Sequence, residues 1–448
     1  MITSFGCASE SAPTSAREPC ARRNPERDVF FGDLHVHTAY SFDAYINEVR
    51  VDPAAAYRFA RGEPVLLPPV DGAGVGTQEV RIDRPLDFAA VTDHSEFLGE
   101  VDGCTTPGSG IYDQDLCVGL RSGDGGALAK LGLQLTADAP TRIDALCGQG
   151  GVDCPALAVD AWSRLRAAAD AAQDRTEACS FTAFVGYEWS GARDLSNLHR
   201  NIIFRGSLVP PRPISYYDEP EPEGLWRRLQ GECLKGLPGC DVLAIPHNSN
   251  WSNGNLFNPV YGADDVELAA LQAAMEPLVE IYQHKGDSEC AAGLSGILGE
   301  PDELCSFEKI RAQPYEDCGD GVGSGGMVAN GCVSRRDFVR GALLAGLEVE
   351  AAIGTNPLRL GIIASTDTHN GTPGQVAEAA YPGHFGFREA TPQDRLTAAV
   401  PGGPRNSPGG LVAVWAEENS REALFDAMRR RETYGTSGPR MVVRFFGG

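Results

Sequence analysis

Two histidines separated by one residue, His35 and His37, stand in residues 30–44, FFGDLHVHTAYSFDA. In a strand, residues i and i+2 point to the same face, so both imidazoles would enter one cavity. Two neighbouring neutral imidazoles are a common way to hold a transition metal. A His-x-His pair alone is weak evidence, because two polar residues on a solvated strand face give the same pattern. The positions of the other histidines therefore decide between these interpretations.

Most of the remaining histidines stand at the ends of short apolar runs. Such runs predict buried strands of a parallel sheet that is covered on both faces. Polar residues at the C-terminal ends of barrel strands form the rim that carries the site in such folds. His199 instead precedes its apolar run, NIIF, and His384 in YPGHFGF has no comparable setting. The four histidines that follow apolar runs are His94 in DFAAVTDHSE, His247 in VLAIPHNSN, His284 in VEIYQHKGDSE and His369 in GIIASTDTHNG.

Taken in order, the motifs HVHT, VTDH, GYEWS with a histidine soon after it, IPHN and STDTH resemble the PHP (polymerase and histidinol phosphatase) superfamily. Within it the chain looks most like the DUF3604 family, from about Phe31 to the C-terminus. The resemblance implies an α/β fold, a distorted (β/α)7-type barrel of the PHP kind. The cysteine-bearing stretches between the motifs are expected to be loop insertions in this barrel.

The resemblance also implies two or three divalent transition metal ions. A ligand set of His, Asp and Glu suits Zn, Mn or Fe. Adjacent ions can share an activated water and clamp both the attacking and the leaving oxygen of a phosphoryl transfer. Asp43 stands where many relatives place a histidine, which would either favour Mn or Fe slightly or leave that ligand position weaker. Matched motif by motif, the first ion is expected on His35, His37, Glu188 and Asp367, the second on His94, His369 and Asp43, and the third on His199 and His247 with Glu188 as a bridge.

The residues expected to act in catalysis are Glu188, Asp367, His284 and Lys285. His284 is equally consistent with a core histidine. Lys285 is one of only four lysines and is a candidate contact for an anionic substrate, with a solvated surface lysine as the alternative. Asp93, beside His94, is interpreted as a residue that orients its neighbours or caps a helix, and not as a ligand.

The 448 residues suit one elaborated barrel. We expect a flexible arm over 1–28 and a barrel over 29–448, with insertions near 103–160, 206–240 and 285–335 that carry substrate specificity. The formal net charge of −23 repels nucleic acid and anionic membranes. No apolar run reaches the roughly 18 residues of a transmembrane helix. The expected partner is a small anionic substrate, and the oligomeric state is left open.

Apolar patterning also predicts the secondary structure in outline. The glycine-rich stretch 103–141 is expected to hold little regular structure. Strands are expected over 29–37, 86–94, 181–190, 198–204, 241–248, 278–284, 358–367, 409–417 and 440–446, and helices over 52–62, 155–173, 225–233, 263–277, 336–350 and 420–431.

The thirteen cysteines avoid the apolar strand runs. Loop disulfides would imply an oxidising compartment, and hence a periplasmic or secreted protein. The first thirty residues lack the apolar core of a signal peptide. Either the start is truncated or the cysteines are reduced, and SFGC leaves a lipoprotein anchor as a further alternative. Neighbours in the sequence suggest Cys104 with Cys117, Cys147 with Cys154, Cys233 with Cys240, Cys290 with Cys305 and Cys318 with Cys332, which leaves Cys7, Cys20 and Cys179 unassigned.

These observations predict a metal-dependent hydrolase. Hydrolysis of phosphate mono- or diesters is the first choice, because it is the activity that the superfamily resemblance implies most often. Hydrolysis of an amide, a carboxylic ester or a sulfate ester is the alternative chemistry. An exported metal-binding protein without catalytic activity is the alternative from another class.

Overall fold

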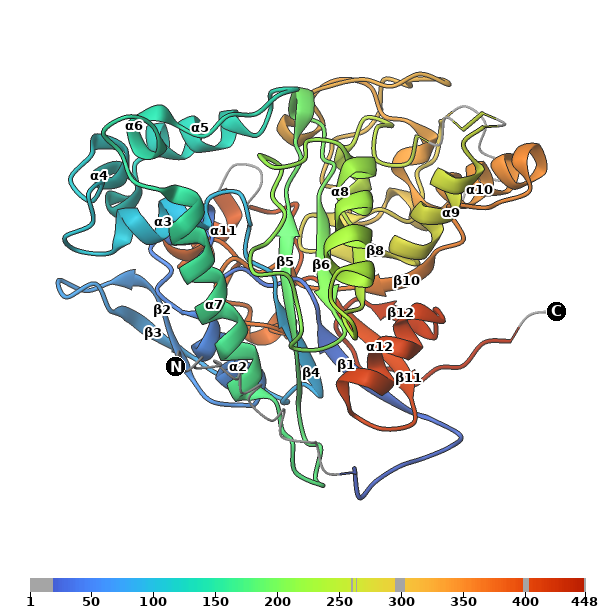
Figure 1. Cartoon of the computed structure of the whole chain (residues 1–448), viewed down its shortest axis with the longest axis horizontal. Helices are drawn as coiled ribbons and strands as arrows, with labels where there is room; N and C mark the ends of the chain where they lie inside the picture. Colours follow the sequence, from blue (N-terminus) through green and yellow to red (C-terminus); the bar gives the residue numbers. More distant parts are fainter. Residues whose placement is uncertain (1–18, 259–260, 263, 295–302, 398–402, 447–448) are drawn as a thin grey trace, which may run out of the picture.

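The chain folds around a curled sheet of seven strands that forms half a barrel (Figure 1). The structure is a computed structural model, and it describes residues 19–258, 261–262, 264–294, 303–397 and 403–446. The order across the sheet is β12 (Thr433–Thr436), β11 (Leu411–Ala416), β1 (Asp28–Asp33), β4 (Phe88–Val91), β5 (Thr182–Trp189), β6 (Arg200–Phe204) and β7 (Val242–Pro246).

Two smaller sheets complete the strands. β10 (Gly361–Ala364), β8 (Leu278–Gln283) and β9 (Gly286–Asp287) form one of them, and β2 (Val65–Val70) pairs with β3 (Gly76–Val80) in a hairpin that was not predicted. The fold is therefore mixed α/β. The expected barrel is confirmed only to this extent, because β8 and β10 do not belong to the large sheet.

The expectation of a parallel sheet is confirmed only in part. β1, β4 and β5 are parallel, but β6 runs antiparallel to both β5 and β7, and β11 runs antiparallel to β1. Antiparallel neighbours need only a short connection, whereas parallel neighbours need a long crossover. The ten residues between β5 and β6 are such a short connection. His199 therefore lies at the start of β6, beside the ends of β5 and β7.

Apolar side chains cover both faces of the sheet, and this explains the absence of alternation in its strands. Ala89 and Val91 of β4 belong to a core cluster with residues of α2 (Pro53–Ala60) and α7 (Cys154–Ala172). Phe88 and Ala90 of the same strand belong to a second cluster with residues of α12 (Arg421–Arg429). Successive residues thus meet different helices, as the two-residue period of a strand requires.

All six predicted helices are present. They correspond to α2, α7, α8 (Pro222–Leu229), α9 (Val266–Met275), α10 (Val339–Ile353) and α12. Asp52, Asp153 and Ser420 cap α2, α7 and α12, because each side chain accepts a hydrogen bond from a backbone N–H of the first turn. Eight of the nine predicted strands are also present, each shorter than expected, as β1, β4, β5, β6, β7, β8, β10 and β11.

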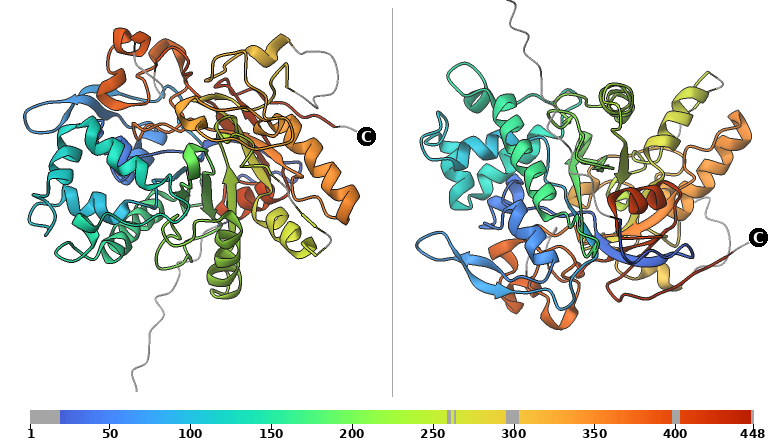
Figure 2. Two further views of the ribbon diagram at one scale, coloured as in Figure 1. Left: turned by 90° about the horizontal axis from the view of Figure 1, so that it is seen from above. Right: turned by 60° about the horizontal axis from the view of Figure 1, so that its bottom comes forward.

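Two local predictions were wrong. The stretch 103–141 contains the helices α4 (Asp115–Ser122) and α5 (Gly125–Gln134), because Leu120, Leu131 and Leu135 are buried in the core despite the many glycines. Residues 440–446 are not a strand, and β12 occupies the sheet edge instead. The remaining helices are α1 (Phe42–Tyr45), α3 (Leu98–Thr105), α6 (Asp144–Cys147) and α11 (Pro392–Thr397). Figure 2 shows α4 to α6 and α9 to α10 on opposite flanks of the sheet.

Six disulfides connect twelve cysteines. The five predicted pairs are all confirmed, and none of these cysteines lies in a strand. The sixth disulfide, Cys20–Cys179, was not predicted and ties the segment before β1 to the rest of the chain. Cys7 and residues 1–18 of the predicted arm lie outside the described residues. Disulfides in this number are typical of an oxidising extracellular environment.

None of the described helices combines the length and the apolar character that a membrane crossing requires.

Candidate metal centre

Most of the expected metal ligands stand just beyond a strand end, whereas Glu188 is the last residue but one of β5, His199 precedes β6 and Asp43 lies on helix α1. β1 ends at Asp33, so His35 and His37 lie beyond the strand and not within it as predicted. Val36 nevertheless pairs with Thr368 in a parallel bridge. This bridge keeps the His-x-His segment beside the segment that follows β10.

Asp33 fastens these two segments to each other. Its Oδ1 atom accepts a hydrogen bond of 3.2 Å from the backbone N–H of His35. Its Oδ2 atom accepts hydrogen bonds from Thr366 Oγ1 at 2.6 Å and from the N–H of Gly374 at 2.8 Å. Burial raises the pKa of the Asp33 carboxyl to about 6, and these hydrogen bonds oppose the shift.

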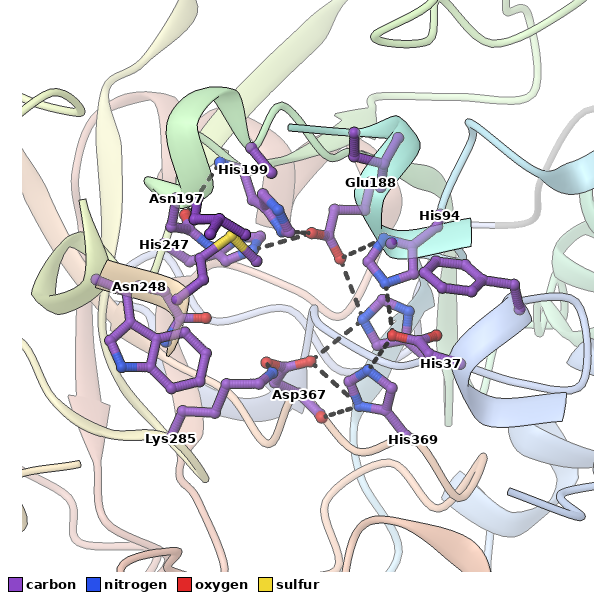
Figure 3. A pocket seen from close by; sticks show the side chains of 18 of the residues that line it. His37, His94, Glu188, Asn197, His199, His247, Asn248, Lys285, Asp367 and His369 are labelled. Atoms are coloured by element: carbon purple, nitrogen blue, oxygen red, sulfur yellow. Dashed lines mark hydrogen bonds and ion pairs between the residues drawn. The ribbon is translucent and has the colours of Figure 1, made fainter. Parts of the chain in front are cut away.

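The four residues expected on the first ion do converge, and Figure 3 shows His37, Glu188 and Asp367 among them. Asp367 Oδ1 lies 3.2 Å from Nε2 of both His35 and His37. Glu188 Oε2 lies 3.2 Å from the first of these nitrogens and 3.1 Å from the second. All four side chains are buried.

The residues expected on the second ion gather around Asp43, which lies on the short helix α1. Asp43 Oδ2 is 3.2 Å from Nε2 of His94 and 3.1 Å from Nε2 of His369. One ligand atom from each of these three residues and one from His37 all lie within 4.8 Å of one another. The aspartate therefore lies among the histidines expected on the second ion, within hydrogen-bond distance of two of them.

The residues expected on the third ion meet the other oxygen of Glu188. Oε1 of this residue lies 2.5 Å from His199 Nδ1 and 3.2 Å from His247 Nε2. The reversed direction of β6 produces this contact, because it brings the residue before β6 to the rim where β5 and β7 end. Glu188 thus faces two groups of histidines, one with each carboxylate oxygen.

The donor atoms fit a divalent cation site. Asp43 Oδ1 and His199 Nε2 are buried and make no hydrogen bond within the described chain. Buried polar atoms without partners are costly, and cations held by nitrogen and oxygen donors would satisfy them. A second group of candidate ligands, Cys147 and Cys154 with Glu100, does not fit, because the two cysteines form a disulfide.

The carboxylates are held in their charged form. Burial alone would raise the pKa of Glu188, but the charges of His94, His247 and His199 hold it well below its usual range. Burial likewise opposes ionisation of Asp367, whose pKa is nevertheless held well below its usual range by His35 and Lys285. Both carboxylates are therefore available as anionic oxygen donors.

Comparison with known proteins places the chain in a family. The family model described as "Protein of unknown function (DUF3604)" matches residues 24–448. The chain belongs to the DUF3604 family.

Two other comparisons carry little information about the fold or activity of this DUF3604 protein. No curated protein matches it. One similar solved structure is a two-domain protein from Bacteroides vulgatus ATCC 8482 that contains a predicted PHP-like metal-dependent phosphoesterase. The identity is 12%, the TM-score is 0.36, and the match covers 94% of this chain and 69% of that chain. A likeness of this degree carries no argument about fold or activity.

Lys285 and His284, which were also expected to act in catalysis, differ in their position relative to the cavity. Lys285 lines the cavity above the cluster, and its Nζ atom forms an ion pair with Asp367 Oδ2. His284 is fully buried, and its Nε2 lies 3.5 Å from the same oxygen. It packs against His384 at 4.7 Å between ring centroids and does not line the cavity. Burial, together with the charge of Lys285, lowers the pKa of His284 well below its usual range.

Asp93 has the orienting position that the sequence suggested. It accepts hydrogen bonds from the backbone N–H and the hydroxyl of Thr38 at 2.6 and 2.7 Å, and from Ser41 Oγ at 2.8 Å. Ser41 Oγ in turn lies 2.9 Å from His37 Nδ1. Asp93 therefore orients the His37 ring through Ser41.

Sequence reasoning missed residues that orient the ligands. Glu280 lies 3.1 Å from His35 Nδ1, and Ser190 lies 2.6 Å from His94 Nδ1. Gln283 donates a hydrogen bond of 2.5 Å to Asp367 Oδ2. A single acidic residue inside the apolar run LVEIYQH was the one signal that could have indicated Glu280. The other contacts join segments far apart in the sequence and leave no local pattern.

Proposed function

We propose that this DUF3604 protein is a metal-dependent hydrolase, and specifically a phosphoesterase acting on phosphate mono- or diesters. The observation that carries the proposal is the concentration of imidazoles around two buried carboxylates. Seven of the eight histidines lie within 3.6 Å of Glu188 or Asp367. Protonating all of these rings together would bring like charges into contact, whereas neutral imidazoles with carboxylates suit divalent cations.

The proposed site holds two or three ions of Zn, Mn or Fe. When bound, such ions would activate water and offset negative charge on the reacting ester. Glu188 would serve two ion positions, because its two oxygens face different histidines. Lys285 would contact the anionic substrate from the side of Asp367. The proposed ligands are His35, His37, Asp43, His94, Glu188, His199, His247, Asp367 and His369, each in contact with at least one other member of the set.

We further propose that the chain belongs to the PHP superfamily and that its strands approximate a distorted (β/α)7-type barrel. The parallel bridge from Val36 to Thr368 supports this view, because it joins the segment after β1 to the segment after β10. The barrel would span residues 29–448 as one domain, with the cysteine-bearing stretches as insertions. The six disulfides support a periplasmic or secreted location.

Metal analysis followed by an ester panel tests the proposal. We expect purified protein, after reconstitution with Zn or Mn, to hold two or three ions and to hydrolyse phosphomonoesters or phosphodiesters. Activity confined to carboxylic esters, sulfate esters or amides would support the assignment as a hydrolase and reject the assignment as a phosphoesterase. A full metal complement without any hydrolysis would favour the metal-binding protein. Fewer than one ion per chain would reject the metal centre itself.

A further inference from the structure

The cavity above the candidate metal centre combines a polar floor with apolar walls (Figure 3). Its volume is about 360 Å³, within the range of pockets that hold small organic ligands. The floor consists of the clustered histidines and carboxylates. The walls include Leu128, Leu135, Leu195, Trp251, Met327 and Val328.

Four of these six wall residues come from two of the cysteine-bearing stretches, 103–160 and 285–335. Leu128 lies on α5, and Leu135 follows the last residue of that helix. Met327 and Val328 lie on the 3-10 turn Gly326–Val328, within the loop that the Cys318–Cys332 disulfide closes. Val328 is 58% exposed although it is apolar. Apolar surface left exposed around a polar site is typical of ligand-binding grooves.

The cavity walls offer few cationic partners to a substrate that carries several negative charges. Among the described residues that line the cavity, Lys285 is the one lysine or arginine, and it is already paired with Asp367. The chain as a whole carries a formal charge of −23. Anionic groups beyond the one that reacts would therefore find no partner and would be repelled by the surface.

We propose, on the basis of the proposed function, that the substrate is an ester with one acidic head group and an apolar aryl or alkyl group. The head group sits over the histidines and carboxylates, and the apolar group packs against Leu128, Met327 and Val328. Nucleotides and sugar phosphates are disfavoured as substrates. Their charged and hydroxylated parts would be desolvated against the apolar walls without gaining hydrogen bonds from them.

Paired ligands that differ only in the apolar group test this proposal. In calorimetry with metal-loaded protein, benzylphosphonate should bind about tenfold or more tightly than methylphosphonate, because one ring is buried against the walls. Phenyl phosphate should likewise be hydrolysed with a higher kcat/KM than glycerol phosphate or glucose 6-phosphate. Leu128→Gln and Met327→Gln should each reduce the binding preference. Leu133→Gln is the matched control, because Leu133 lies on the same helix, is 59% exposed and does not line the cavity.

The outcomes separate this proposal from the proposed function. Preferential binding of benzylphosphonate that weakens only in the wall variants supports an apolar ligand, even if no ester is hydrolysed and the proposed function fails. Equal or weaker binding of benzylphosphonate overturns the proposal. Hydrolysis that favours glucose 6-phosphate also overturns it, while the phosphoesterase stands.

A second inference concerns Asn248, which follows His247 and lines the same cavity. Its side-chain orientation is set by its neighbours. The side-chain oxygen of Gln283 accepts a hydrogen bond of 2.6 Å from the backbone N–H of Lys285. The amide nitrogen of Gln283 is therefore the atom that donates to Asp367 Oδ2. The same nitrogen donates to Asn248 Oδ1 at 2.7 Å.

The amide nitrogen of Asn248 is consequently left as a spare donor. Nδ2 is buried and finds no hydrogen-bond partner among the described residues, and the whole residue is only 3% exposed. Its backbone has φ 48° and ψ 41°, a left-handed conformation that asparagine tolerates better than most residues. A buried unsatisfied donor is costly in the free protein. We infer that Asn248 Nδ2 donates a hydrogen bond to an acidic oxygen of the substrate.

Inorganic phosphate serves as the probe for Asn248. Asn248→Gly keeps the backbone conformation and removes the donor, and it should weaken phosphate binding about tenfold. Asn248→Asp replaces the donor with an anion and should weaken binding further. Both variants should keep the wild-type metal content and thermal stability. Phosphate affinity within about twofold of wild type in Asn248→Gly overturns the inference. Loss of ions from both variants also overturns it, because the amide would then act through the ligands.

Discussion

Lys285 and Asp367 form a buried ion pair at the edge of the cavity, between the Nζ and Oδ2 atoms. The Oδ1 atom of the same carboxylate lies 3.2 Å from Nε2 of both His35 and His37. Asp367 thus divides its two oxygens between Lys285 on one side and the pair His35 and His37 on the other. This division allows the two roles to be tested separately.

Lys285→Met should retain the metal ions, because Asp367 keeps its hydrogen bond from Gln283. Loss of the cation should reduce kcat/KM for anionic esters by about 10- to 100-fold, the scale of one charge-assisted hydrogen bond. Metal analysis and steady-state kinetics check both expectations. Lys130→Met, at an exposed position on α5, is the control. An unchanged kcat/KM would show that Lys285 serves only to hold Asp367.

Glu188→Gln should cost one or two ions per chain and reduce turnover by at least about a hundredfold, because it removes the charge shared by two groups of histidines. The protein should still fold, as thermal melts will check. Glu276→Gln is a matched control, since Glu276 is a buried glutamate that pairs with Arg200 and does not line the cavity. That variant should lose stability and keep its ions. A full metal complement with normal turnover would remove Glu188 from the site.

Glu280→Gln should weaken metal binding or activity by about 10- to 100-fold, although Glu280 is not a proposed ligand. Its carboxylate lies 3.1 Å from His35 Nδ1 and accounts for the tautomer in which Nε2 faces the cluster. Titration of metal-free protein with Zn or Mn measures the change in affinity. Unaltered affinity would mean that packing alone orients the His35 ring.

The substitution of both Cys318 and Cys332 by serine should raise KM for an apolar ester and leave the metal content unchanged. The disulfide closes the loop that presents Met327 and Val328 to the cavity. Removing it should also lower the free energy of unfolding by about 2–4 kcal/mol. The control is the double substitution of Cys233 and Cys240, which form a disulfide and do not line the cavity. A similar KM in both double variants would separate the loop from substrate binding.

Thiol titration of the denatured, non-reduced protein should find a single reactive cysteine. Twelve of the thirteen cysteines are paired, and Cys7 is the remaining one. Reduction before the titration should expose all of them. Detection of nearly thirteen thiols without reduction would contradict the oxidised state and the proposed export.

The sequence by itself determined most of the candidate ligands and the helices. Ligands such as His94, His247 and His369 each follow a short apolar run, and the end of such a run is visible locally. Helices are likewise encoded locally, by spacing and by caps such as Asp153 and Ser420. The five short-range disulfides were predictable for the same reason, because their cysteines are neighbours along the chain.

Only the tertiary structure decided how these parts are arranged. The direction of β6 depends on pairing with β5 and β7, and an apolar run such as NIIF has no direction of its own. The contact between Glu280 and His35 joins residues 245 positions apart, and Cys20 pairs across 159 positions. Hydrogen bonds with Lys285 and Asp367 fix the orientation of the Gln283 amide, which then donates to Asn248 Oδ1 and leaves Asn248 Nδ2 as the spare donor. Such relationships depend on which surfaces the folded chain brings together, and that information is not contained in any local stretch of sequence.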